Sequence, residues 1–143
     1  MVNNDYTARI IAAPTSAQIA SLQFLLNLGI HYNVLINFCL WSFDMVNDQG
    51  YGAPYGLWNR ILTNPTNRNS YLVNWLTPMV QAASPYAQSS LLSFEVFNEP
   101  EGMTTKWGWT SCNSGSSDCA KVDIPTIQKF ANLVASTIHN VNR

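Results

Sequence analysis

Charged side chains are scarce in this chain of 143 residues, because Asp, Glu, Lys and Arg make up only 10% of it, against roughly 25% in an average soluble domain. Seven basic and eight acidic residues give a net charge of -1. The chain therefore lacks the basic field that attracts a phosphate backbone. We expect no nucleic acid among its partners.

Long apolar runs are also missing. The longest runs, such as residues 34–41, are interrupted by polar residues such as Asn37 and fall far short of the roughly 20 residues that span a bilayer. We expect no membrane partner. The first residues, Met1 to Tyr6, have neither the charged start nor the apolar core of a signal peptide.

Cysteine is rare, with three residues in all. Cys112 and Cys119 flank a loop rich in Gly and Ser, which lets the chain turn back on itself, so a disulfide is easy to form. They could instead be half of a zinc site, but no Cys-x-x-Cys or His-x-x-x-His spacing accompanies them. We favour the disulfide, which implies a secreted protein whose signal peptide was removed, or a fragment of one. We expect Cys39, inside an apolar run, to be a buried free thiol.

The two histidines, His31 and His139, have no carboxylate or second histidine at ligand spacing. We expect both to be structural or solvated, and we expect the chain to use no metal and no cofactor.

The order of elements follows from periodicity and capping signals. Thr15, followed by Gln18, predicts the start of an amphipathic helix that Gly29 ends. Residues 34–41 are rich in β-branched and aromatic side chains and predict a buried strand. Residues 72–83 predict a second helix, kinked by Pro78.

Further along the chain, residues 91–97 predict a second strand, and Asp123 caps a third helix. Strands separated by helices pair in parallel, so the fold class is α/β. Two strands do not make a stable sheet, because both outer edges stay unpaired. We expect residues 1–143 to be a single incomplete domain that needs missing strands or another chain.

The three glutamates lie together, at Glu95, Glu99 and Glu101, at the end of the second predicted strand and just after it. Strand alternation puts Glu95 and Glu99 on one face, and the same alternation in the first strand puts Asn37, Cys39 and Trp41 on that face. In parallel α/β folds the site lies at the carboxyl ends of the strands. Glu99 is therefore where acid–base chemistry is expected, unless it is an ordinary loop carboxylate.

Residues 94–100, Phe-Glu-Val-Phe-Asn-Glu-Pro, resemble the fourth-strand motif of clan A glycoside hydrolases, particularly the cellulases and β-mannanases of family 5. Residues 37–44 resemble the third barrel strand of the same group. The resemblance is specific from about Val34 to Glu101. It implies a partial (β/α)8 TIM barrel that covers roughly the third and fourth βα units and a preceding helix.

The resemblance also implies roles for two residues. Glu99 would be the general acid/base, and Asn98 would hydrogen-bond a sugar hydroxyl. The family's nucleophile is a glutamate that ends the seventh strand, which this sequence does not reach. Glu95 does not replace it, because four residues of strand separate it from Glu99 by ~13 Å. We expect Glu95 to pair with a buried cation. Asp44 is the other carboxylate that could approach Glu99.

Aromatic side chains commonly form the floor of clefts that bind β-linked polysaccharides. Trp41, Trp107 and Trp109 are the candidates for sugar contact. Core packing is an equal alternative for Trp41. Of Trp107 and Trp109, we expect one to face substrate and the other to pack under the Cys112–Cys119 loop.

Two classes of function remain. The first is a retaining, endo-acting glycoside hydrolase for β-1,4-linked glucan or mannan, of which this chain carries the acid/base residue but not the nucleophile. The second is a non-catalytic carbohydrate-binding or structural protein derived from such a barrel. In either case the isolated chain should be almost inactive, and its partners are a β-linked saccharide and the remainder of the barrel or another chain.

The cysteine spacing yields a first prediction. If Cys112 and Cys119 are bonded, titration of thiols in the denatured, unreduced chain should count one free cysteine, and reduction should raise the count to all three. Three free thiols before reduction would contradict the disulfide.

Overall fold

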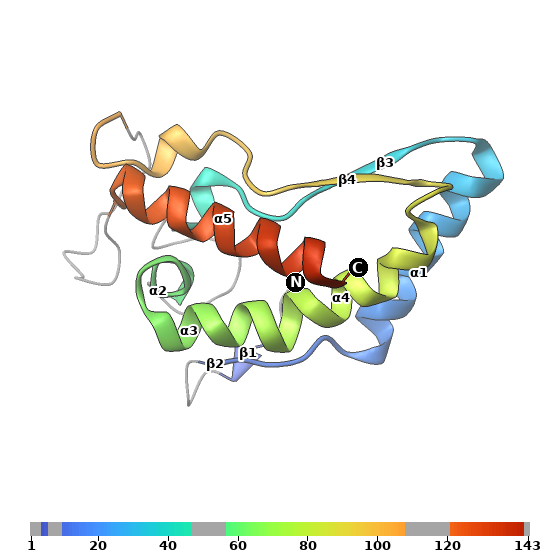
Figure 1. Ribbon diagram of the computed structural model, residues 1–143, viewed down its shortest axis with the longest axis horizontal. Helices are drawn as coiled ribbons and strands as arrows, with labels where there is room; N and C mark the ends of the chain where they lie inside the picture. Colours follow the sequence, from blue (N-terminus) through green and yellow to red (C-terminus); the bar gives the residue numbers. More distant parts are fainter. Residues whose placement is uncertain (1–3, 6–9, 47–56, 108–120, 142–143) are drawn as a thin grey trace.

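The computed structural model describes residues 4–5, 10–46, 57–107 and 121–141 (Figure 1). The elements are β1 (Asn4–Asp5), β2 (Ile10–Ile11), α1 (Ser16–Tyr32), β3 (Ile36–Cys39), η1 (Phe43–Val46), α2 (Leu57–Thr63), α3 (Pro65–Ser70), the π-helical η2 (Tyr71–Leu76), α4 (Thr77–Ala83), η3 (Ser84–Tyr86), β4 (Leu91–Glu95), η4 (Pro100–Met103) and α5 (Ile124–Val141). None of the helices in this part of the chain is both long and apolar enough to span a membrane.

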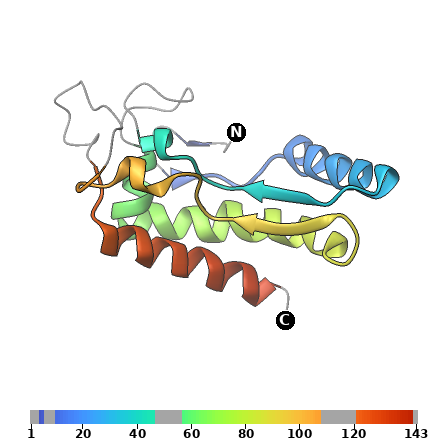
Figure 2. The same cartoon turned by 90° about the horizontal axis from the view of Figure 1, so that it is seen from above.

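Strands β3 and β4 form a two-stranded parallel sheet, which confirms the α/β class predicted from the order of elements. Figure 1 shows α3, α4 and α5 on one side of the two strands, and Figure 2 shows the strands side by side. No described element covers the opposite face of the sheet (Figure 1). A separate antiparallel pair, β1 with β2, was not expected from the sequence.

Helix α1 begins with the capping box that the sequence predicts. The Thr15 hydroxyl accepts from the Gln18 backbone N–H at 3.3 Å, and the Gln18 side chain accepts from the Thr15 N–H at 2.8 Å. The prediction that Gly29 ends the helix is wrong, because the helix continues to Tyr32 and its C-cap is Asn33, at φ 54°. Asparagine adopts this left-handed conformation more readily than most residues.

Gly29 serves close packing instead. A Cβ placed there would lie 2.8 Å from the Ser90 Cβ and 2.9 Å from the Val34 carbonyl oxygen. The Ser90 hydroxyl also donates to the Leu26 carbonyl at 2.6 Å, which holds the start of β4 directly against α1. A larger residue at position 29 would separate these segments.

The second predicted helix lies within a longer helical run, since α3 already begins at Pro65 with Asn64 as its N-cap. The run contains a π turn, η2, immediately before Pro78, and the Thr77 hydroxyl donates to the Leu72 carbonyl at 2.8 Å. A π turn changes the backbone pairing locally, which accommodates a residue without an N–H. The sequence indicated a disturbance at Pro78 but not its form.

An aromatic core lies between the sheet and the helices. The indole of Trp41 is 1% exposed and contacts the rings of Tyr71, Phe97 and Phe130 at centroid distances of 5.6, 6.3 and 5.1 Å. Complete burial raises the pKa of the Tyr71 hydroxyl well above its ordinary value. Rings at these distances and tilts add to the stabilisation from burial.

Helix α5 supplies one side of this core, as its periodicity predicts. Ile127, Phe130 and Val134 are buried. Asp123 accepts from the Thr126 N–H at 2.9 Å, which confirms the predicted cap. A smaller cluster, formed by Leu22, Leu26, Ala83 and Leu91, joins α1 and α4 to β4.

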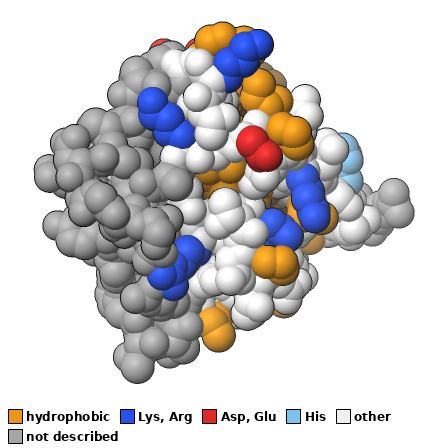
Figure 3. Space-filling view, turned by 90° about the vertical axis from the view of Figure 1, so that its left-hand side faces the viewer, with side chains coloured by type: hydrophobic (Ala, Val, Ile, Leu, Met, Phe, Trp, Pro, Cys, Tyr) orange, Lys and Arg blue, Asp and Glu red, His pale blue; other side chains and the backbone are white. Residues whose placement is uncertain are grey.

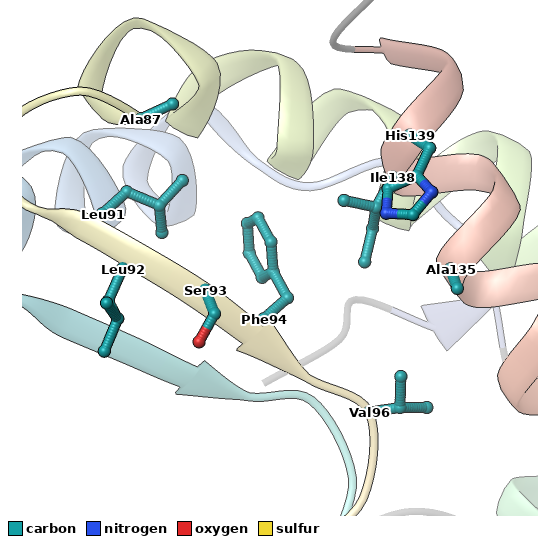
Figure 4. A pocket seen from close by; sticks show the side chains of 9 residues that line it. All are labelled: Ala87, Leu91, Leu92, Ser93, Phe94, Val96, Ala135, Ile138 and His139. Carbon is teal, nitrogen blue, oxygen red and sulfur yellow. The ribbon is translucent and has the colours of Figure 1, made fainter.

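The outer side of β4 is open. A cavity of about 280 Å³ lies between β4 and α5 (Figure 4). It is lined by Ala87, Leu91, Leu92, Ser93, Phe94, Val96, Ala135, Ile138 and His139. Leu92 is 60% exposed, a high value for an apolar strand residue. An exposed strand edge with an apolar groove beside it is typical of a sheet that continues with another strand.

The packing of Gly29 yields a prediction. Gly29→Ala should destabilise the chain by roughly 1–3 kcal/mol, because the new methyl group overlaps Ser90 and the Val34 carbonyl. Urea unfolding measures the change. Ala20→Gly, at an exposed position of the same helix, is the matched control and should cost about 1 kcal/mol through helix propensity alone. A stabilising Gly29→Ala would contradict the close contact.

Candidate active site

A row of polar side chains lies on the open face of the sheet. The Ser93 hydroxyl donates to the Asn37 Oδ1 at 2.7 Å, and the Asn37 Nδ2 donates to a Glu95 carboxylate oxygen at 3.1 Å. Cys39 pairs in register with Glu95 on the neighbouring strand. The predicted alternation therefore holds for Asn37, Cys39 and Glu95.

The apolar residues between them face the helices. Phe38 and Phe94 stack at 6.1 Å between centroids, and Ile36 and Val96 pack against the two core clusters. One face of the sheet is thus polar and open, while the other is apolar and covered.

Two predictions for this face are wrong. Glu95 is exposed, and its carboxylate is bonded to Asn37 rather than to a buried cation. Cys39 is a free thiol, as expected, but it is exposed rather than buried. Both errors have the same physical cause: within the described residues no element covers this face.

Trp41 does not share the open face, contrary to the prediction from alternation. Strand β3 ends at Cys39, and beyond it the chain turns so that the Trp41 indole enters the aromatic core. Its carbonyl oxygen accepts from the Asn98 N–H at 2.8 Å and from the Cys39 thiol at 3.1 Å. The alternative of core packing is the correct one for Trp41.

Backbone hydrogen bonds hold Asn98 at the carboxyl ends of both strands. Besides donating to Trp41, Asn98 accepts from the Phe43 N–H at 3.2 Å, in a parallel bridge between Ser42 and Asn98. The Asn98 residue is exposed. These two bonds fix the backbone of Asn98 where both strands end, and its side chain is exposed there.

Glu99 is exposed and has φ 49° and ψ 54°, a left-handed conformation that is uncommon for glutamate. Such a conformation costs free energy and persists where the surroundings impose it. Pro100 follows, and the Gly102 N–H donates to the Glu99 carbonyl at 3.0 Å. Gly102 in turn packs so closely on Phe43 that a Cβ would lie 2.8 Å from that side chain. The turn is therefore set by contacts on both sides, and the Glu99 side chain is exposed.

The segment after the turn carries Trp107, which is 56% exposed. The Lys106 ammonium lies 4.4 Å from the centroid of its ring, a cation–π contact. Trp109, the Cys112–Cys119 pair and the side chain of Asp44 lie outside the described residues, so their predictions stay as stated.

Figure 3 faces the end of the molecule at which both strands finish, and among the described residues it shows Lys and Arg side chains scattered between hydrophobic ones, with an acidic side chain among them. His31 and His139 are both exposed. Among residues 4–5, 10–46, 57–107 and 121–141, no three His, Cys, Asp or Glu side chains are grouped so that they could hold a metal ion.

Sequence analysis missed Thr104, which is 4% exposed and bonds the backbone of both Glu101 and Trp107. No local pattern indicated this, since a threonine in a loop is common. Only its burial beside Val122, far along the chain, sets it apart.

Asn98 and Glu99 are thus exposed at the carboxyl ends of two parallel strands, which is where α/β barrels carry their sites. No protein-family model matches the chain. A mannan endo-1,4-beta-mannosidase of Cryptopygus antarcticus is 33% identical over an alignment 127 residues long, and the match covers 76% of this chain and 33% of the relative.

Solved structures show the same fold. The β-1,4-D-mannanase of Cryptopygus antarcticus matches 98% of this chain with a TM-score of 0.75 and 24% identity, and the match covers 39% of that protein. The β-1,4-mannanase of the sea hare Aplysia kurodai matches 98% of this chain with a TM-score of 0.79 and 19% identity, over 41% of its length. The β-mannanase of the blue mussel Mytilus edulis matches 99% of this chain with a TM-score of 0.77 and 19% identity, and the match covers 41% of that protein.

These comparisons confirm the resemblance that residues 94–100 indicated. The chain is a homologue of the barrel glycoside hydrolases of the family 5 type over most of its length. It spans about a third of the length of the curated mannanase that it matches.

The chemistry of the open face yields a prediction. Partial burial raises the pKa of the Cys39 thiol, the backbone of Trp41 lowers it, and the Glu95 carboxylate raises it. A raised pKa leaves less of the reactive thiolate at a given pH. Glu95→Gln removes the negative charge that raises the pKa of Cys39, so the pKa should fall and alkylation of Cys39 at pH 8 should become about two- to fivefold faster. Iodoacetamide labelling, followed by mass spectrometry of the Cys39 peptide, measures the rate.

Glu101→Gln is the matched control for this experiment, because it removes the same charge from an exposed residue of η4. Its rate should equal that of the unaltered chain. Equal acceleration in both variants would show that net charge, and not the position of Glu95, governs the thiol.

Proposed function

We propose that this chain is the part of a retaining endo-β-1,4-mannanase that carries the acid/base residue. Two observations support the proposal: the homology to mannanases over most of the chain, and the exposed Asn98-Glu99 pair where both strands end. The glucan alternative has less support, because the relatives named above are described as mannanases or mannosidases.

Glu99 is assigned the role of general acid/base. In its protonated form it donates a proton to the glycosidic oxygen as the bond to the leaving sugar breaks, and as a carboxylate it then takes a proton from the attacking water. The left-handed turn and the contact of Gly102 with Phe43 hold it at the edge of the sheet. Asn98 is assigned a hydrogen bond to a sugar hydroxyl, for which its exposed amide is suited.

Retention needs a second carboxylate about 5–5.5 Å from the first. Glu95 is unsuited, because its carboxylate lies on the face of the sheet, where it is bonded to Asn37, whereas Glu99 lies in the turn beyond the end of β4. We assign the nucleophile to a part of the barrel outside these 143 residues, since the mannanases that the chain matches are more than twice as long.

The proposal extends to architecture. We assign β3 and β4, each with its following helix, to the third and fourth βα units of the barrel, and α1 to the preceding helix. Residues 1–143 are then a single incomplete catalytic domain. The open edge of β4 and the cavity beside α5 are where the next strand would pair (Figure 4). A secreted location, with the Cys112–Cys119 disulfide, belongs to the same proposal.

Trp107 is assigned as the aromatic contact for the sugar, because it is the exposed member of the predicted set within the described residues. An indole presents a flat apolar surface to the C–H face of a pyranose ring. Trp41 is left out because it is 1% exposed and part of the core.

Activity tests the proposal. A chimera in which residues 1–143 replace the aligned segment of the Cryptopygus antarcticus mannanase should hydrolyse β-1,4-mannan, with retention seen by proton NMR of the first products. The isolated chain should be almost inert, because it lacks the nucleophile. Glu99→Gln should lower the chimera's kcat by roughly 10²- to 10⁴-fold, the usual worth of acid–base help, because the amide keeps the shape but does not supply the proton.

Glu101→Gln, two residues away and exposed, is the control and should keep activity within about twofold, as for a surface change. Full activity of the Glu99→Gln chimera would refute the assignment of Glu99. Hydrolysis by the isolated 143 residues at the rate of a whole mannanase would refute the claim that half of the site is missing. Binding of mannan without hydrolysis by the chimera would favour the non-catalytic alternative.

A further inference from the structure

Three overlapping hydrogen bonds span the segment from the proposed acid/base residue, Glu99, to the backbone of Trp107. The Gly102 N–H donates to the Glu99 carbonyl at 3.0 Å, and the Thr104 N–H donates to the Glu101 carbonyl at 3.1 Å. The Trp107 N–H then donates to the Thr104 hydroxyl at 3.0 Å. Between Glu99 and Trp107, therefore, each of these three residues donates a backbone N–H to the residue three positions earlier in the chain.

Thr104 is the residue at which this segment is buried and paired with a distant part of the chain. It is 4% exposed and forms a parallel bridge with Val122, which is also 4% exposed. The Val122 N–H donates to the Met103 carbonyl at 2.9 Å, and the Thr105 N–H donates to the Val122 carbonyl at 3.0 Å. These bonds fasten the segment to the chain that leads into α5.

The Thr104 hydroxyl is satisfied in both directions. It donates to the Glu101 carbonyl at 2.9 Å and accepts from the Trp107 N–H. A hydroxyl is one of the few small side chains with a donor and an acceptor on one atom. Serine could make the same two bonds, whereas valine has the same shape and could make neither.

The indole of Trp107 is restricted on one side. The Lys106 ammonium lies 4.4 Å from the ring centroid, so one face of the ring is occupied by a cation. A sugar ring can then stack only on the other face. The bond from the Trp107 N–H to the Thr104 hydroxyl fixes the backbone from which this ring projects.

We propose that Thr104 is a positioning residue that holds Trp107 as a one-sided platform for a β-linked mannosyl unit at a fixed place relative to Glu99. This inference rests on the proposed function and names the residue that sets its aromatic subsite. Thr104 itself touches no substrate.

Amide exchange in the ¹⁵N-labelled 143-residue chain tests the bond directly. The Trp107 amide should exchange more slowly than a solvated amide in the unaltered chain and in Thr104→Ser. In Thr104→Val it should exchange roughly tenfold faster, as for a lost hydrogen bond. An unprotected Trp107 amide in the unaltered chain, or equal exchange in the serine and valine variants, would overturn the inference.

Titration with mannohexaose, followed through the indole N–H signal of Trp107, tests the consequence. The signal should shift in the unaltered chain and in Thr104→Ser, and the Kd should rise about three- to tenfold in Thr104→Val. A shift with equal Kd in all three chains, or no shift at all, would contradict the positioning role. This test is independent of the test of Glu99. Amide exchange and sugar binding require no catalysis, and hydrolysis of mannan by the chimera does not depend on whether the Trp107 amide is protected.

Discussion

Two backbone hydrogen bonds at Asn98 place the candidate site. By donating to Trp41 and accepting from Phe43, Asn98 joins the chain beyond β3 to the chain beyond β4. This bridge lies past the last residue of either strand, so it brings the two loops together where the sheet itself has ended. The left-handed turn at Glu99 follows at once, which means that the carboxylate is placed by the same bridge.

The buried indole of Trp41 stabilises the backbone bridge between Trp41 and Asn98 from the side of the core. The indole contacts Tyr71, Phe97 and Phe130, which come from the helical run, the chain after β4 and α5. Burial of such side chains stabilises each by about 1.5–3 kcal/mol, and the ring pairs add to this. The aromatic core therefore packs beneath the loops that follow the two strands, and the Trp41 indole is part of that core.

Local signals predicted the parts of the structure that depend on a few neighbouring residues. The capping box at Thr15, the cap at Asp123 and the apolar face of α5 involve side chains within one or two helical turns. The alternation was equally predictable from Asn37 to Cys39 and from Ser93 to Val96, because the pleat determines it. It is wrong for Leu92, which was expected to face the helices but is 60% exposed, because the register shifts at the start of the pairing and Leu91 is buried instead. Errors arose where a distant segment decided the outcome: Gly29 packs on Ser90, and Cys39 lies on a face that no described element covers.

The sequence by itself determined the class of fold, the parallel pairing of the two strands and the residue proposed as the acid/base, Glu99, because repeating patterns and a seven-residue motif contain that information. Tertiary structure alone decided that Trp41 and Thr104 are buried and that Glu99 adopts a positive φ. These features depend on contacts between residues far apart in the chain, among them Asn98 with Trp41 and Val122 with Met103. Such contacts form only when the helices and strands pack, because no single segment contains both partners.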